Sequence, residues 1–93
     1  MKHVVVYDIE DDKVRLRMAH VLERYGRRVQ ESVFECDLTE PALDQMTKGL
    51  REALGSPDKG NVRVYQVCAN CMRASFGLGD IAPSDDDPCI IID

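Results

Sequence analysis

The sequence lacks the segments that place proteins in membranes or outside the cell. No apolar run approaches the ~20 residues that a membrane-spanning helix needs. The first ten residues also lack the long apolar stretch and small-residue cleavage site of a secretion signal. We therefore expect a cytoplasmic protein without a membrane partner, whose four cysteines are reduced. The 93 residues suffice for one small domain and leave no room for a second.

Familiar catalytic groupings are also missing. His3 and His20 stand alone, no Ser-His-Asp grouping is recognisable, and no glycine-rich loop opens a helix. Cys68 and Cys71 form one CxxC pair, but a structural zinc site needs four ligands. The pair also lacks the βαβ context of a thioredoxin motif. We interpret these two cysteines as buried or incidental thiols.

Charge is distributed unevenly along the chain. The net charge is -5, yet residues 13–28 hold six bases and one acid, while residues 80–93 hold five acids and no base. A local basic stretch steers anionic ligands, so the acidic total does not exclude nucleic acid. None of the five aromatic residues lies between Lys13 and Arg24. Contact with phosphates is therefore favoured over stacking on bases.

Hydrophobic periodicity predicts an α+β domain. The run at 3–9 is typical of a strand in the middle of a sheet, buried on both faces. The further elements are a helix over 12–26, period-two residues over 28–37, a helix from Thr39 to Gly55, and a strand over 62–67. Asp11 or Asp12 should cap the first helix and Gly26 should end it. The order β-α-β-β-α-β predicts a ferredoxin-like sandwich of two helices on a four-stranded antiparallel sheet.

The pattern weakens after Val67. Residues 68–88 resemble a loop, and residues 89–93 (CIIID) predict a short strand. A detached apolar strand usually pairs with an exposed sheet edge, its own or a partner's. We therefore predict a ferredoxin-like domain over 1–78. Residues 79–93 form an acidic loop and a C-terminal strand that is exchanged with, or docked on, a partner.

Asp8 ends the predicted central strand and has two interpretations. It either caps a turn or binds a divalent metal. Because Mg²⁺ keeps several waters, one or two carboxylates suffice when phosphate supplies the remaining ligands. A two-fold axis near Asp8 would bring two carboxylates together, where an activated water could attack a phosphodiester.

The basic stretch places four side chains on one flank of the predicted helix, Lys13, Arg17, His20 and Arg24. They span about 16 Å, which is long enough to follow a nucleic-acid backbone. Arginine offers the bidentate fork that phosphate recognition favours. The alternative is a solvated helix face that pairs with Glu23 and the acidic tail.

The segments VVVYDIEDDKVRLR, RVQESVFECDL and VRVYQVCANC, at this spacing, carry a resemblance to a known family. Over roughly residues 1–72 the chain resembles the CRISPR-associated Cas-two family. These are small spacer-acquisition proteins of antiviral defence that partner the CRISPR integrase. The combination of YDIxDD, RxR and SVFECDL is specific, whereas each motif alone would be weak.

The resemblance implies a prokaryotic, ferredoxin-like homodimer whose C-terminal strand crosses to the neighbouring subunit. It implies that Asp8 faces its counterpart and binds Mg²⁺, with Mn²⁺ as an alternative. It also implies a bridge between integrase subunits that holds double-stranded DNA. A metal-dependent endonuclease acting on single-stranded RNA or on DNA is a second activity of that family.

Carried over by residue, the resemblance assigns functional positions to Tyr7, Asp8, Arg15, Arg17, Arg28 and Phe34. We take Asp8, Tyr7 and Phe34 as the catalytic set, with Asp8 as the metal ligand. The candidate nucleic-acid-binding residues are Lys13, Arg15, Arg17, Arg24, Arg27 and Arg28. The alternative function is a small regulatory module of the same fold that binds a metabolite and no nucleic acid. A phospho-acceptor receiver domain is disfavoured, because 93 residues are too few for five βα units.

Overall fold

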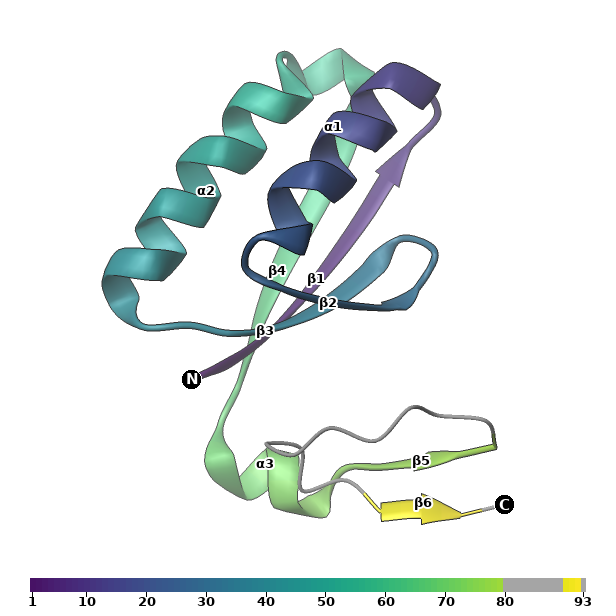
Figure 1. Ribbon diagram of the computed structural model, residues 1–93, viewed down its shortest axis with the longest axis vertical. Coiled ribbons are helices and arrows are strands. Elements are labelled where there is room, and N and C mark those ends of the chain that lie inside the picture. The colour runs from purple at the N-terminus through teal and green to yellow at the C-terminus, as the bar shows by residue number, and fades with distance from the viewer. Residues whose placement is uncertain (80–89, 93) are drawn as a thin grey trace.

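The computed structural model describes residues 1–79 and the backbone of residues 90–92. In chain order the elements are β1 (Lys2–Ile9), α1 (Asp12–Glu23), β2 (Gly26–Gln30), β3 (Val33–Asp37), α2 (Glu40–Leu54), a 3-10 turn (Pro57–Lys59), β4 (Gly60–Val67), α3 (Ala69–Ala74), β5 (Phe76–Leu78) and β6 (Ile90–Ile92). The α+β class is confirmed, with α1 and α2 covering one face of the sheet β1–β4 (Figure 1). None of the described helices has the length and apolar character needed to cross a membrane.

The main sheet has the strand order β2-β3-β1-β4, and every neighbouring pair is antiparallel. β1 is central, as its apolar run predicts. Along β1, Val5, Tyr7 and Ile9 are buried beneath the helices, whereas Val4 and Val6 are half-buried on the opposite face. The expectation of burial on both faces is therefore wrong for a single chain, because the helices cover only one face.

Helix α1 begins where the sequence predicts. Asp11 is its N-cap, and its carboxylate accepts hydrogen bonds from the backbone N–H groups of Lys13 (2.9 Å) and Val14 (3.0 Å). Val14 and Met18 belong to an apolar stripe that packs into the core. The N-cap and this stripe together fix how α1 lies on the sheet.

Helix α1 ends earlier than the sequence predicts, and Gly26 does not serve as its stop. The helix ends at Glu23 with Arg24 as C-cap, and Gly26 is the first residue of β2. A Cβ atom at Gly26 would lie 2.2 Å from the carbonyl oxygen of Glu35 and 2.5 Å from Cys36 Sγ. Glycine is required here because β3 approaches the backbone closely.

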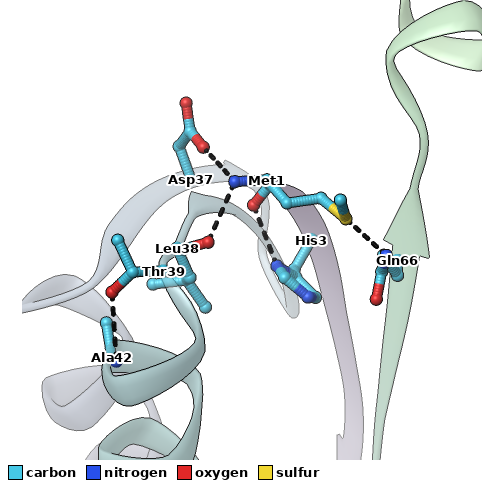
Figure 2. Close-up of polar contacts among 7 residues, drawn as sticks. All are labelled: Met1, His3, Asp37, Leu38, Thr39, Ala42 and Gln66. Carbon is cyan, nitrogen blue, oxygen red and sulfur yellow. Dashed lines mark hydrogen bonds and ion pairs between the residues drawn. The ribbon is translucent and has the colours of Figure 1, made fainter.

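Helix α2 has the predicted caps at both ends. The Thr39 hydroxyl accepts a hydrogen bond from the Ala42 N–H at 3.3 Å (Figure 2). Met46 and Leu50 are buried against the other layers. Gly55 ends the helix with a φ of 80°, a left-handed conformation that glycine adopts without strain.

Polar contacts join the start of β1 to the end of β3 and to β4 (Figure 2). The Met1 ammonium group donates to the Asp37 carboxylate and to the Leu38 carbonyl, each at 2.9 Å. His3 Nδ1 lies 3.0 Å from the Met1 carbonyl oxygen, and the Gln66 amide contacts the Met1 sulfur. The hydrogen bond and charge of the ammonium group hold the pKa of Asp37 below its usual value.

The segment after β4 is more ordered than the sequence predicts. Residues 69–74 form helix α3 and residues 76–78 form β5, where a loop was expected. β6 confirms the predicted C-terminal strand over residues 90–92, and it pairs with β5 in parallel. In Figure 1 these three elements lie at the end of β4, beyond the helix–sheet layers. Exchange of this strand with a partner stays a prediction, and the acidic residues 80–89 lie outside the described residues.

Candidate metal and nucleic-acid site

Asp8 lies at the end of β1 on the sheet face that the helices leave open. It is exposed, while its neighbours Tyr7 and Ile9 are buried on the helix side. The register between β1 and β4 places Asn61 opposite Asp8. Together with Glu10, Asp11, Asp58, Lys59 and Gly60, these two residues line an open hollow of about 400 Å³.

Three of the nearby carboxylates are already engaged within the chain. Hydrogen bonds from the Val14 and Lys13 N–H groups hold the pKa of Asp11 below its usual value, with the Val14 bond contributing most. Asp12 forms an ion pair with Arg15, and Asp58 accepts a hydrogen bond from the Ser56 hydroxyl. These three carboxylates therefore stabilise the turns around the hollow.

The hollow supplies too few ligands to hold a divalent cation by itself. Over the described part of the chain, no three His, Cys, Asp or Glu side chains are grouped so that they could hold a metal. Asp8 offers one exposed carboxylate, which suits Mg²⁺ when another carboxylate, waters or phosphates supply the remaining ligands. The described residues alone therefore supply one exposed carboxylate at this hollow and no complete metal site.

Tyr7 and Phe34 lie in the core beside the Asp8 strand. Tyr7 is 2% exposed and Phe34 is fully buried. Their rings stack with centroids 6.4 Å apart, and the Tyr7 hydroxyl donates to the Glu31 carbonyl at 3.2 Å. Within one chain both side chains support the strand that presents Asp8, and neither reaches the open hollow.

Arg15 braces the turn that follows Asp8. Its guanidinium Nη1 donates to the Ile9 carbonyl at 3.2 Å, and Nη2 forms the ion pair with Asp12. The same Nη1 lies 3.4 Å from the Glu10 carbonyl oxygen. Arg15 is therefore tied to the β1–α1 turn, and its side chain is only 39% exposed.

The remaining basic residues of α1 differ in how they are engaged. Arg17 is exposed, and its Nε and Nη2 lie 3.4 and 3.3 Å from the Ala53 carbonyl oxygen near the end of α2. A cation at this position suits the negative end of α2. Lys13, His20 and Arg24 are exposed, and their side chains form no hydrogen bond or ion pair within residues 1–79. These three are the α1 side chains most available to a ligand.

Two further bases lie on β2, which is an edge strand of the sheet. Arg27 pairs with Glu35 on β3 at 3.5 Å. The guanidinium of Arg28 lies over the Phe34 ring, 5.2 Å from its centroid. The basic stretch predicted from the sequence thus runs along α1 and continues onto the β2 edge.

The uncovered face of the main sheet is largely apolar at its middle. Val4, Val6 and Val33 are half-buried on this face, and Tyr65, opposite Val4, is 51% exposed. Charged or amide side chains lie among them or toward the strand ends, including Arg63, Glu35, Asp8 and Asn61. An apolar sheet face of this kind is incomplete without a second layer.

Asn61 and Lys59 are the neighbours of Asp8 that the sequence did not reveal. Both lie more than fifty positions along the chain from Asp8. Lys59 ends the 3-10 turn before β4, and Asn61 is the second residue of β4. Their proximity follows from the β1–β4 register, which period-two patterning alone does not fix. The composition of residues 55–61 (GSPDKGN) predicts a loop, but it does not predict that this loop lies beside Asp8.

Comparison with solved structures identifies the fold in other organisms. Streptococcus pyogenes Cas2 superimposes with a TM-score of 0.70 at 31% identity, covering 85% of this chain and 100% of that one. A chain from a structure titled "Partial Cas6-RT-Cas1--Cas2 complex" superimposes with a TM-score of 0.69 at 30% identity, covering 81% and 82%.

Comparison with sequences gives the same answer. The family model "CRISPR associated protein Cas2" matches residues 1–74. A protein of Chloroflexus aurantiacus named "CRISPR-associated endoribonuclease Cas2 1" is 39% identical over 92 residues, which are 99% of each chain. The chain belongs to the Cas2 family of CRISPR-associated proteins, the Cas-two family that its motifs resemble.

Proposed function

We propose that this chain is a CRISPR adaptation protein that acts as a homodimer, holds duplex DNA and bridges integrase subunits. The proposal includes the ferredoxin-like arrangement, for which the β2-β3-β1-β4 order is the supporting observation. The observation that supports DNA holding best is the set of exposed, unengaged bases on α1 beside the basic β2 edge. The solved complex named for Cas1 and Cas2 supports an integrase partner. Membership of the family does not favour the metabolite-binding alternative.

The homodimer is proposed to form through the uncovered sheet face. Val4, Val6 and Tyr65 would be removed from water when a second sheet packs on them, at roughly 25 cal/mol for each Å² of apolar surface. Two-fold symmetry makes such a contact self-complementary. Because Asp8 lies on the same face, pairing this face is the arrangement that could bring two carboxylates together.

The DNA contact is proposed to lie along α1 and the β2 edge. Lys13 and Arg24 lie near opposite ends of α1, and Arg28 follows on the helix side of β2. Arg27 lies on the uncovered face, where it pairs with Glu35. Contacts of this type reach phosphates and read no sequence, so binding should be weakly specific and salt-dependent. The proposed dimer leaves this surface bare on both subunits, as a bridge requires.

A metal-dependent endonuclease is the second activity that we propose, on RNA or on DNA. Its support is the exposed Asp8 and the relatives named as endoribonucleases. Asp8 of each subunit would hold Mg²⁺, or Mn²⁺, and the bound ion would supply Lewis acidity to a phosphodiester. Tyr7 and Phe34 would act as positioning residues, because they fix the β1 strand from the core. The cytoplasm of a prokaryote stays the predicted location.

Duplex binding is tested by removing the two unengaged bases at the ends of α1. The double variant Lys13→Ala/Arg24→Ala should bind duplex DNA more weakly whatever its sequence, because two phosphate contacts are lost. The slope of log K against log salt should fall by about 1.8, that is about 0.9 for each contact. Fluorescence anisotropy over a salt series measures both quantities.

The matched control is Lys48→Ala/Arg51→Ala, which removes two exposed bases of α2 instead. We expect this control to keep the affinity and salt slope of the unmodified chain. Unchanged binding in the α1 variant, or equal weakening in the α1 and α2 variants, would contradict the proposed surface.

A further inference from the structure

Two cysteines lie together where β4 passes into α3, away from the candidate site. Cys68 is the N-cap residue of α3, and Cys71 lies in its first turn. Both are exposed, so of the two expected alternatives, buried or incidental thiols, burial is wrong; Cys36 is buried in the core. Reagents in solution can therefore reach the thiols of Cys68 and Cys71, whereas the Cys36 thiol is packed in the core.

The Cys68 thiol is in contact with the Cys71 backbone. The Cys71 backbone N–H donates to Cys68 Sγ at 3.4 Å. This bond, followed by one from the Cys71 thiol, holds the pKa of Cys68 below its usual value. The hydrogen bond and charge of Cys68 raise the pKa of Cys71. Cys68 is thus the stronger thiolate and Cys71 the retained proton donor, an asymmetry that distinguishes an attacking from a resolving cysteine.

We propose that Cys68 and Cys71 form a redox-active dithiol that reacts with small disulfides and closes reversibly to a Cys68–Cys71 disulfide. The Cys68 thiolate attacks one sulfur of the small disulfide, forms a mixed disulfide and expels one thiolate. Cys71 then loses its proton to solvent and attacks Cys68 Sγ, which expels the second thiolate. The protein gives up two electrons, which reduce the small disulfide to two thiols.

A metal site is the competing interpretation of a CxxC pair. A structural zinc ion requires four ligands, and no third His, Cys, Asp or Glu joins these cysteines in residues 1–79. A disulfide needs only two sulfurs, and Cys68 and Cys71 are both exposed, with the Cys71 backbone hydrogen-bonded to Cys68 Sγ. The dithiol interpretation is therefore complete within the described part of one chain.

The disulfide would form at a structural junction. Cys68 follows the last residue of β4, and α3 connects that strand to β5, which pairs with β6. A Cys68–Cys71 bond would link the N-cap of α3 covalently to its first turn. The bond would therefore restrict the backbone of the segment that joins the main sheet to the β5–β6 pair. It would change no contact in the hydrophobic core.

The experiment uses the full chain, reduced and then freed of reductant. It is exposed to oxidised glutathione, trapped with iodoacetamide, and analysed by peptide mass spectrometry. We expect a disulfide confined to the peptide that contains Cys68 and Cys71, reversed by dithiothreitol. Before oxidation, brief alkylation at pH 7 should label Cys68 faster than Cys71.

Serine variants separate the two roles. Cys71→Ser should accumulate glutathione on Cys68, because no resolving thiol remains, and Cys68→Ser should lose the fast alkylation. The control Cys89→Ser should still form the 68–71 disulfide. Equal slow alkylation of both thiols, a disulfide that requires Cys89, or thiols that react only after a chelator removes zinc would each overturn the proposal.

Discussion

Asp8 is the residue on which the proposed metal chemistry depends. Its neighbours in β1 are fixed in the core, while its own carboxylate faces the open side of the sheet. The carboxylates of Asp11 and Asp12 are occupied in the following turn. Asp8 is therefore the strand-end carboxylate that a shared metal ion could use.

At the residue scale, Asp8→Asn should abolish magnesium-dependent cleavage without changing the fold. The amide is nearly isosteric but lacks the negative charge that Mg²⁺ requires. Cleavage of labelled RNA and duplex DNA, with magnesium and with EDTA, measures the effect. Asp44→Asn, an exposed carboxylate on α2, is the matched control and should cut as the unmodified chain does. Magnesium-dependent cleavage that persists in Asp8→Asn would assign the activity to another site or a contaminant.

Helix α1 is the element that connects the hollow beside Asp8 to the proposed DNA surface. Its N-cap Asp11 lines the hollow beside Asp8, and its exposed residues are the candidate phosphate contacts. The caps at Asp11 and Thr39 could be predicted from the sequence because they depend on a few neighbouring residues.

Other elements could not be predicted because their causes are not local. Gly26 looked like a helix stop, but it serves the close approach of β3. The period-two run over 28–37 hid a turn at residues 31–32 and a bulge between Arg28 and Gln30. Helix α3 has six residues and buries none of them, so it has no apolar stripe to detect.

At the element scale, Asp11→Ala should destabilise α1 in a pH-dependent way. The pKa of Asp11 is lowered from 3.8 in the folded chain, so the carboxylate stabilises the fold fully above that pH. This contribution is lost as the pH falls through the lowered pKa. The urea midpoint of Asp11→Ala should thus lie below that of the unmodified chain at pH 7, and the gap should narrow in acid.

Asp11→Asn is the control, because asparagine caps a helix but does not titrate there. It should keep most of the midpoint at pH 7. A midpoint for Asp11→Ala equal to that of the unmodified chain at pH 7, or a gap that widens in acid, would contradict the assigned cap.

The two sides of the whole molecule differ in the side chains that they expose. The helix layer presents the exposed bases Lys13, His20 and Arg24. The uncovered sheet face presents Val4, Val6 and Tyr65 at its middle, with Asp8 at its end. This division is what the proposed function needs, since one side can pair with a second copy while the other holds DNA. The family, the central strand and the basic stretch could be predicted from the sequence. The open face and the Asp8–Asn61 pairing required the sheet register.

At the scale of the whole molecule, sedimentation velocity at micromolar concentration tests the central claim, assembly through the uncovered sheet face. The chain should sediment at twice its mass of 10.5 kDa. Tyr65→Asp on that face should sediment as single chains, while Leu16→Asp on α1 should stay paired. These side chains are matched in exposure, at 51% and 59%. Single chains of the unmodified protein, or a Tyr65→Asp variant that still pairs, would contradict the account.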